Sequence, residues 1–278
     1  MSFFQTSDGV KIYYQCKGRQ EPLLVCIHGW ATDSRVFQRL YASLTKRQQI
    51  LLVDLRGHGR SEQDQHYQNY SYRRLGQDIL ELLNYLKQTQ VIFIGWSMGV
   101  FILLENLSFL QPLAKGFVFI APTPQFRANE TFPCAMPKAS AQRLERNLKR
   151  DYQKTLGHFY SLITWAEVIS DQVEQRINTV FSQIRTDLHF EVLCATLTEL
   201  YTTNYQVELS QIIKPSLIVC GQLDRICPWA CAKAMANSIA QAELKVFSHC
   251  GHLPFMTQEA KFLDVITGWL DDFSGSIE

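Results

Sequence analysis

The sequence has almost no net charge and none of the features that would direct it into or across a membrane. Its 278 residues include 27 Lys and Arg against 26 Asp and Glu, a formal net charge of +1. No field of one sign therefore favours nucleic acid or a membrane surface as a partner. No apolar run approaches the roughly 18 residues that span a bilayer, and the N-terminal stretch MSFFQTSDGV lacks the regions of a signal peptide. These absences predict a cytoplasmic protein that binds neither nucleic acid nor membrane.

The eight cysteines form neither a metal-binding pattern nor a recognisable disulfide pattern. No Cys-x-x-Cys pair occurs, and Cys227 and Cys231 lack partner histidines at ligand spacing, so no metal site is expected. Several other cysteines lie inside apolar runs such as LLVCIHG and SLIVCG, where small buried thiols are common. Together with the missing export signal, this favours reduced thiols in the cytoplasm.

Short apolar runs alternate with longer amphipathic stretches along the chain. The runs are continuously apolar, as expected of parallel strands covered on both faces, and occupy residues 23–29, 50–55, 91–97, 116–122, 216–222 and 244–250. Helices are predicted between them, at 36–45, 71–88, 98–109, 228–240 and 258–272. This order predicts an α/β fold with a mostly parallel, doubly wound sheet. The stretch Ser7-Asp8-Gly9 predicts an antiparallel hairpin added at one edge.

One long interval departs from this alternation. From about Thr123 to Val207 the sequence has helix-like segments punctuated by prolines and no strand-like run. The interval is far longer than the dozen or so residues that a crossover between parallel strands needs. We therefore expect a core formed by residues 1–122 and 208–278, with residues 123–207 inserted as a helical lid.

The stretch IGWSMGV, residues 94–100, places Ser97 between two glycines, where a strand-like run ends and a helix is predicted to begin. A serine at such a place either caps the helix or is presented by the turn as a nucleophile. Glycines on both sides are typical of the second case, because they remove side chains where strand and helix crowd together. A helix that begins behind Ser97 also directs the positive end of its dipole toward negative charge forming there. We therefore expect Ser97 to be a catalytic nucleophile.

A serine nucleophile needs a base, and the base needs an acid that orients it. With this kind of turn the expected chain order is Ser, then Asp or Glu, then His. Asp224 follows the run SLIVC in the loop GQLDRICP, and His252 follows the last apolar run in HCGHLP. We expect Asp224 and His252 to complete a catalytic triad, with His249 as the rival candidate for the base.

Two backbone N–H groups are expected to form an oxyanion hole beside the nucleophile. The sequence His28-Gly29-Trp30 follows the first long strand-like run, from which the N–H of Trp30 can point at the same place as the N–H of Met98. His28 is interpreted as a residue that braces this loop. The segment DLRGHGRS, residues 54–61, is likewise interpreted as loop-forming, with His58 outside the chemistry.

Together these motifs resemble the α/β-hydrolase superfamily over nearly the whole chain. They are HGW at 28–30, DLRGHGRS at 54–61, GWSMG at 95–99, GQLDRICP at 221–228 and GH at 251–252. Within the superfamily, the stretches IHGWATDSRVF, LVDLRGHGRS, IGWSMG and the segment from APTPQF to HFYSL are similar to the pimeloyl-acyl-carrier-protein methyl ester esterases of biotin synthesis. The sequence departs from that type at Phe132-Pro133, where Trp-Pro is expected, and at Arg56, His58 and Val100, where Pro, Phe and Gly are usual.

The resemblance implies the α/β-hydrolase fold and an esterase that cleaves a methyl ester through a serine acyl-enzyme, without a metal or cofactor. It also implies a strongly acidic partner, acyl carrier protein. Read as a helix, the region around residues 138–154 carries a basic stripe for docking such a partner, formed by Arg143, Arg146, Arg150 and Lys154, and Asp151 is a candidate start of a second helix. Aromatic side chains are expected to line an acyl channel: Trp30, Trp96, Phe126 and Phe159.

Other classes of function remain open at this point. A short-chain carboxylesterase, a thioesterase or a carbon–carbon bond hydrolase would use the same residues, because a fold does not fix a substrate. A non-catalytic ligand-binding protein on the same scaffold is the second alternative, against which the Ser97, Asp224 and His252 set argues. A monomer is expected.

Overall fold

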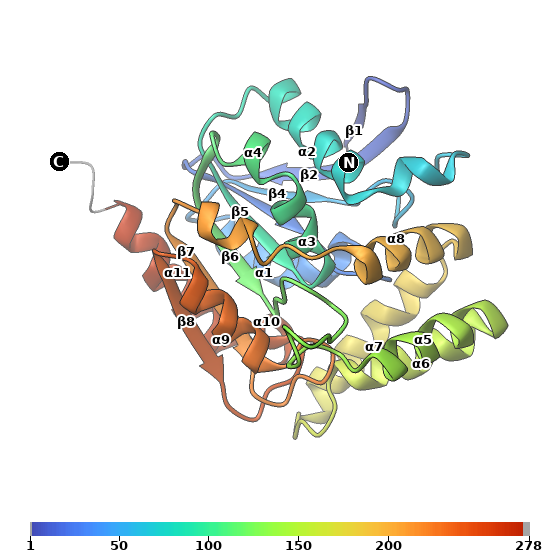
Figure 1. Ribbon diagram of the computed structural model, residues 1–278. Helices are drawn as coiled ribbons and strands as arrows, with labels where there is room; N and C mark the ends of the chain where they lie inside the picture. The colour runs from blue at the N-terminus through green and yellow to red at the C-terminus, as the bar shows by residue number, and fades with distance from the viewer. Residues whose placement is uncertain (1, 275–278) are drawn as a thin grey trace.

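The computed structural model describes residues 2–274, and a single eight-stranded sheet runs through its centre (Figure 1). Its strand order is β1-β2-β4-β3-β5-β6-β7-β8. The strands are β1 (Ser2–Gln5), β2 (Lys11–Lys17), β3 (Leu23–Ile27), β4 (Ile50–Val53), β5 (Val91–Trp96), β6 (Ala114–Ile120), β7 (Ser216–Gly221) and β8 (Ala242–Phe247).

From β4 to β8 all neighbouring strands are parallel, whereas β2 runs antiparallel to both β1 and β4. Strands β3, β4, β5 and β7 are buried along their whole length, which explains why their sequences are continuously apolar. The predicted mostly parallel sheet with an N-terminal antiparallel hairpin is therefore confirmed. Because parallel strands end at the same edge, the loops after β3, β5, β7 and β8 come together there.

Helices cover both faces of the sheet (Figure 1). The helices of the described chain are η1 (Ser34–Phe37), α1 (Gln38–Leu44), η2 (Tyr67–Tyr70), α2 (Tyr72–Tyr85), α3 (Met98–Glu105), α4 (Leu107–Leu110), α5 (Lys138–Arg150), α6 (Tyr152–Ile163), α7 (Asp171–Arg185), α8 (Phe190–Thr202), η3 (Glu208–Gln211), α9 (Trp229–Ser238), α10 (Pro254–Thr257) and α11 (Glu259–Ser274), where η marks a 3-10 helix.

The segment between β6 and β7 carries the helices α5 to α8, at the lower right of Figure 1. We call residues 123–207 the helical insertion. Hydrogen bonds join it to the loops at the carboxyl edge of the sheet: for example, Tyr160 donates to the carbonyl of Ala31 (2.7 Å), Trp30 to that of Leu193 (3.1 Å), and the N–H of His252 to that of Ile163 (2.8 Å). The insertion is therefore anchored on the loops that carry the predicted site.

Two predicted helices are interrupted in the structure. The helix expected at 98–109 ends at Glu105, because the Asn106 side chain donates to the carbonyls of Tyr72 and Ile102 and a short helix, α4, follows. The basic stripe does not lie on one helix either. Asp151 separates α5 from α6 and accepts the Lys154 N–H at 3.0 Å, as an N-cap does. Reading the stripe as one continuous helix was wrong, and Asp151 is the start of a second helix.

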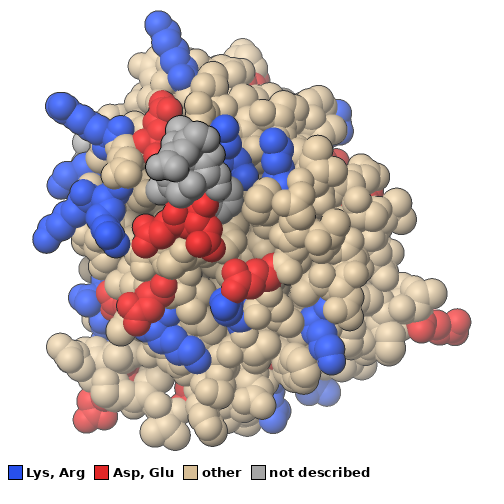
Figure 2. All heavy atoms as spheres, turned by 90° about the vertical axis from the view of Figure 1, so that its left-hand side faces the viewer, with Lys and Arg blue, Asp and Glu red and all other residues tan. Residues whose placement is uncertain are grey.

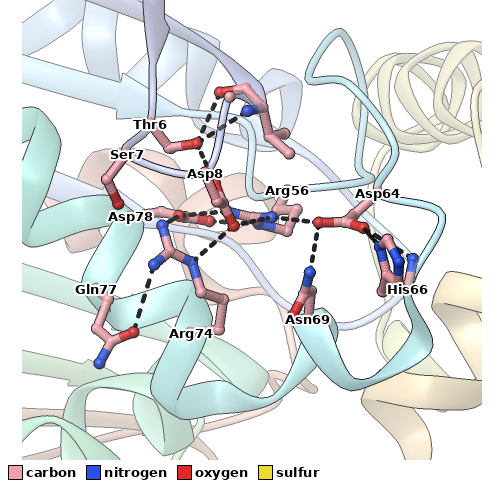
Figure 3. A network of polar contacts seen from close by, with 12 residues as sticks. Thr6, Ser7, Asp8, Arg56, Asp64, His66, Asn69, Arg74, Gln77 and Asp78 are labelled. Atoms are coloured by element: carbon pink, nitrogen blue, oxygen red, sulfur yellow. Dashed lines mark hydrogen bonds and ion pairs between the residues drawn. The ribbon is translucent and has the colours of Figure 1, made fainter.

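A fully buried arginine joins the N-terminal hairpin to the body of the protein (Figure 3). Arg56, from the loop after β4, donates to Asp78 of α2 at 2.8 and 2.9 Å, to Asp64 at 2.7 Å and to Asp8 of the hairpin turn at 2.9 Å. Arg74, one turn before Asp78 on α2, also donates to that carboxylate. The three carboxylates come from three different segments, namely the hairpin turn, the loop after β4 and α2, so the cluster fixes their relative position.

Charged side chains of both signs are mixed on the face that carries α11 (Figure 2). This mixture agrees with a formal net charge of +1, and it gives that face no field of one sign. Within residues 2–274, no helix has the length and apolar character needed to cross a bilayer.

Candidate active site

Ser97 occupies the tight turn from β5 to α3 in a strained backbone conformation. Its φ of 53° and ψ of −113° lie outside the regions favoured by residues with a Cβ atom. A Cβ added to Gly99 would lie 2.3 Å from the carbonyl oxygen of Ile27, and one added to Gly95 would lie 2.9 Å from the backbone of Gly99. Only glycine permits this close approach. Ser97 occupies the N-cap position of α3, but its side chain makes no capping hydrogen bond, so its hydroxyl does not serve as a cap.

Asp224 and His252 form a buried pair on the loops that follow β7 and β8. The Nδ1 atom of His252 lies 2.7 Å from Oδ2 of Asp224, and the other oxygen of Asp224 accepts the N–H groups of Ile226 (2.8 Å) and Cys227 (2.9 Å). Because a carboxylate only accepts, Nδ1 carries the proton and Nε2 has a free lone pair in the neutral ring. Nε2 is buried and has no hydrogen-bond partner, so its lone pair is not occupied by another protein group. His249 is exposed, and the structure brings His252 to Asp224 instead.

The backbone of His252 is held from two sides. The indole N–H of Trp96, the residue before Ser97, donates to the His252 carbonyl at 2.9 Å, and the two rings lie 5.5 Å apart. The His252 N–H donates to Ile163 at the end of α6. Trp96 thus supports the histidine loop and links it to the serine turn. Trp96 does not line the groove that lies between α5 and α6.

The loop after β3 packs directly against the serine turn. A Cβ added to Gly29 would lie 3.3 Å from Cβ of Ser97, so the backbone that leads to Trp30 passes beside the serine. His28 is fully buried, accepts the Leu55 N–H at Nε2 (3.1 Å) and contacts its neighbour's carbonyl through Nδ1 (3.0 Å). Burial lowers the pKa of His28 to about 4, so the ring is neutral at pH 7 and serves as a brace.

A groove of about 650 Å³ lies between α5 and α6 and reaches the loop that carries Asp224. Apolar side chains such as Leu144, Phe159 and Leu162 form part of its wall. Its cations include three members of the predicted stripe, namely Arg143, Arg150 and Lys154. Arg146 is exposed but does not line the groove, and Phe126 stacks on Tyr201 (5.7 Å) away from it. Trp30 does not line the groove, but it meets Phe159, which does, edge to face at 4.9 Å.

Three residues near this site were missed by the sequence analysis. Arg225 lines the groove and lies 5.0 Å from the ring of Trp165, and His158 lines the groove as well. Burial raises the pKa of the Cys227 thiol well above its usual value, and the Ser97 side chain interacts with that thiol. The one sequence signal was the adjacency of Arg225 to Asp224, which places both residues in the loop after β7. No three His, Cys, Asp or Glu side chains within residues 2–274 gather in a way that would hold a metal ion.

The chain belongs to the α/β-hydrolase fold family, whose model matches residues 22–259. At the level of particular proteins, it is similar to two pimeloyl-[acyl-carrier protein] methyl ester esterases. The protein of Nitrosomonas europaea is 29% identical over 257 residues, which cover 87% of this chain and 93% of that protein. The protein of Xanthomonas axonopodis pv. citri is 30% identical over 235 residues, covering 84% and 89%.

Solved structures of several activities share the fold. An esterase from Exiguobacterium antarcticum superposes with a TM-score of 0.89 at 26% identity, covering 97% of this chain and 99% of that one. A bromoperoxidase from Bacillus anthracis superposes with a TM-score of 0.87 at 20% identity, covering 97% and 100%. At the latter identity the likeness shows the fold alone, and two named activities on one scaffold show that substrate has to be argued from the site.

Proposed function

We propose that this chain hydrolyses the methyl ester of pimeloyl-acyl-carrier protein, with Ser97, Asp224 and His252 as its catalytic triad. At the coarser level it is a carboxylic ester hydrolase, the class to which its curated relatives and the Exiguobacterium esterase belong by name. The observation that supports the triad is the Asp224–His252 contact of 2.7 Å, beside a strained serine turn. The substrate is proposed from the names of the curated relatives.

In the proposed mechanism, His252 removes the Ser97 proton while the serine oxygen attacks the ester carbonyl. Asp224 stabilises the imidazolium that forms, and its two bonds to backbone N–H groups keep its own position fixed. The N–H groups of Trp30 and Met98 stabilise the oxyanion, each by roughly 2.7–4 kcal/mol judged from the removal of one such donor in another enzyme. Methanol then leaves, and water hydrolyses the acyl-enzyme with His252 as the base.

We propose that the helical insertion acts as a lid that presents the groove to acyl carrier protein. The groove combines apolar walls, suited to an acyl chain, with the exposed cations Arg143, Arg150 and Lys154 at its border. An acidic carrier would be steered to this border and not to the mixed-charge face of Figure 2. Arg146 on α5 belongs to the same exposed surface, and Arg225 is added to the set because it lines the groove. The protein is proposed to act as a cytoplasmic monomer.

The nucleophile is tested by Ser97→Ala. We expect turnover of a p-nitrophenyl ester and of the carrier-bound methyl ester to fall at least about 10⁴-fold, with an unchanged circular dichroism spectrum. Ser238→Ala, on the exposed surface of α9, is the matched control and should keep full activity. Substantial activity of the Ser97→Ala protein would refute the assignment. A wild-type protein that binds esters without hydrolysing them would instead support the non-catalytic alternative.

The docking surface is tested by reversing two groove cations, as Arg143→Glu together with Arg150→Glu. Loss of electrostatic steering should lower kcat/KM for the carrier-bound ester by about tenfold or more and leave a small p-nitrophenyl ester within about twofold. Lys149→Glu is the control, since Lys149 lies on the same helix, pairs with Glu145 at 2.8 Å and does not line the groove. Equal losses on both substrates would contradict the docking proposal.

A growth assay distinguishes the proposed function from that of a general carboxylesterase or thioesterase. A bacterial strain that needs biotin because it lacks its own methyl esterase should grow without biotin when it expresses this chain. Wild-type activity on small esters without such growth would favour a general esterase.

A further inference from the structure

Two cysteines from distant parts of the chain are in contact beside the beginning of the helical insertion. Cys134 lies in the segment between β6 and α5, and Cys231 lies in the first turn of α9. Their Sγ atoms are 3.5 Å apart. A disulfide bond requires about 2.05 Å, so the two sulfurs have to approach each other by roughly 1.5 Å to form a covalent link.

The surroundings of the two sulfurs differ in a way that assigns them different roles. Cys231 is fully buried in a small apolar cluster with Phe132 and Ala135, and burial raises the pKa of its thiol. Cys134 packs against the edge of this cluster and is only partly buried. A small oxidant therefore reaches Cys134 first, because Cys134 is the more accessible thiol. Cys231 is the second thiol because its Sγ lies 3.5 Å from that of Cys134, and it must lose its proton before it attacks the oxidised sulfur.

We propose that Cys134 and Cys231 form an oxidative modification site at which a hydroperoxide produces a reversible intramolecular disulfide. The sulfur of Cys134 attacks one peroxide oxygen and the O–O bond breaks. With hydrogen peroxide as the oxidant, the products are a sulfenic acid on Cys134 and one water. The sulfur of Cys231 then displaces the sulfenic oxygen as a second water and forms the S–S bond. Two thiols thus lose two protons and two electrons, and the peroxide takes up both. A small dithiol reverses the reaction by exchange.

The bond would join the first segment of the insertion to the core helix that follows the Asp224 loop. Met136 and Pro137, two and three residues after Cys134, line the groove, and α9 begins directly after Pro228. Because the two sulfurs are 97 residues apart in the sequence, the link closes a long loop and constrains the unfolded chain. The modification does not depend on the proposed catalytic triad.

The test uses the full-length reduced protein, freed of reductant and treated with a few equivalents of hydrogen peroxide. Remaining thiols are alkylated, and the digest is analysed by mass spectrometry. We expect a peptide pair linked through Cys134 and Cys231, a mass loss of about 2 Da before alkylation, and a rise of the thermal midpoint by about 5 °C. Dithiothreitol should reverse both changes.

Cys134→Ser and Cys231→Ser should each abolish the linked peptide and the thermal shift. Cys194→Ser is the matched control, because Cys194 is also partly buried but lies on α8, and it should behave like the wild type. The proposal is wrong if peroxide yields no Cys134–Cys231 peptide, whether Cys134 stays reduced or is oxidised singly. It is equally wrong if oxidised wild-type and Cys134→Ser proteins show the same thermal shift. If Cys231→Ser does not fold, the comparison of the wild-type and Cys134→Ser proteins decides whether the disulfide forms.

Discussion

Replacing Arg56 by methionine removes the charge at the centre of the cluster in Figure 3 and keeps a side chain of similar length. The guanidinium is fully buried and is surrounded by the carboxylates of Asp8, Asp64 and Asp78. In Arg56→Met all three acids lose a partner at once. Asp78 and Asp8 both retain Arg74, which lies 3.6 Å from Asp8, whereas Asp64 retains Asn69 and His66 as partners.

The cost follows from burial. Asp78 is 3% exposed, and burial raises its pKa while the two arginines oppose that rise. Removing one partner from a buried ion pair costs about 3–5 kcal/mol, a large part of the roughly 5–15 kcal/mol that stabilises a typical domain. For a chain of this size, this corresponds to a drop of about 6–20 °C in Tm. Part of the loss should disappear below about pH 4, where the carboxylates of the unfolded chain are protonated.

Urea unfolding followed by circular dichroism measures this loss, and Arg39→Met provides the matched control. Arg39 also forms an ion pair, with Glu259 at 2.6 Å, but its side chain is 56% exposed. Exposed pairs contribute less than about 1 kcal/mol. The reasoning is refuted if Arg56→Met loses no more stability than Arg39→Met, because burial would then not decide the contribution of the pair.

Two further predictions concern close packing and pH. Gly99→Ala should fold poorly and lose activity, because its Cβ would lie 2.3 Å from the carbonyl of Ile27. Gly268→Ala, with no atom within 4 Å of the added Cβ, should instead gain about 0.5–1 kcal/mol in the free energy of unfolding. Expression, Tm and activity check this, and equal behaviour of the two variants would contradict it. Burial lowers the pKa of His28 to about 4 and of His58 to about 3 from 6.5. The unfolded chain therefore binds more protons below pH 6.5, and the free energy of unfolding should fall by roughly 1.4 kcal/mol per pH unit for each ring between pH 6.5 and 5. His58→Asn should reduce that slope in urea titrations at stepped pH, and an unchanged slope would show that His58 is not the source.

Much of the sheet could be predicted from the sequence because buried parallel strands leave an unmistakable apolar run. The predicted run at 91–97 matches β5 to within one residue, and its position before a glycine-flanked serine marked the turn. The ends of helices were less predictable. Asn106 ends α3 through bonds to Tyr72 and Ile102, and a partner such as Tyr72 is known only once α2 has packed against α3. Local propensity carries no information about such a partner.

In the candidate active site, too, some residues could be predicted from the sequence and others depend on how the chain packs. Asp224 and His252 were predictable because chain order and the common edge of parallel strands place their loops together. Trp96 was expected to touch substrate, yet its indole N–H supports the histidine loop, a role that depends on where His252 comes to lie. The contribution of Ile163 is made by a backbone carbonyl, which every residue possesses, so no side-chain pattern reveals it. Residues that act through their backbone have to be found in the structure.

The bond between the His252 N–H and the Ile163 carbonyl has a consequence for protein engineering. A shortened protein without residues 123–207 would leave this donor and the Ala31 carbonyl without their partners, so we expect its site loops to be less well fixed. Chimeras that exchange the insertion with that of a relative face the same requirement. A transplanted segment would bring new selectivity only if it also supplied an acceptor at the place of Ile163 and a donor at that of Tyr160.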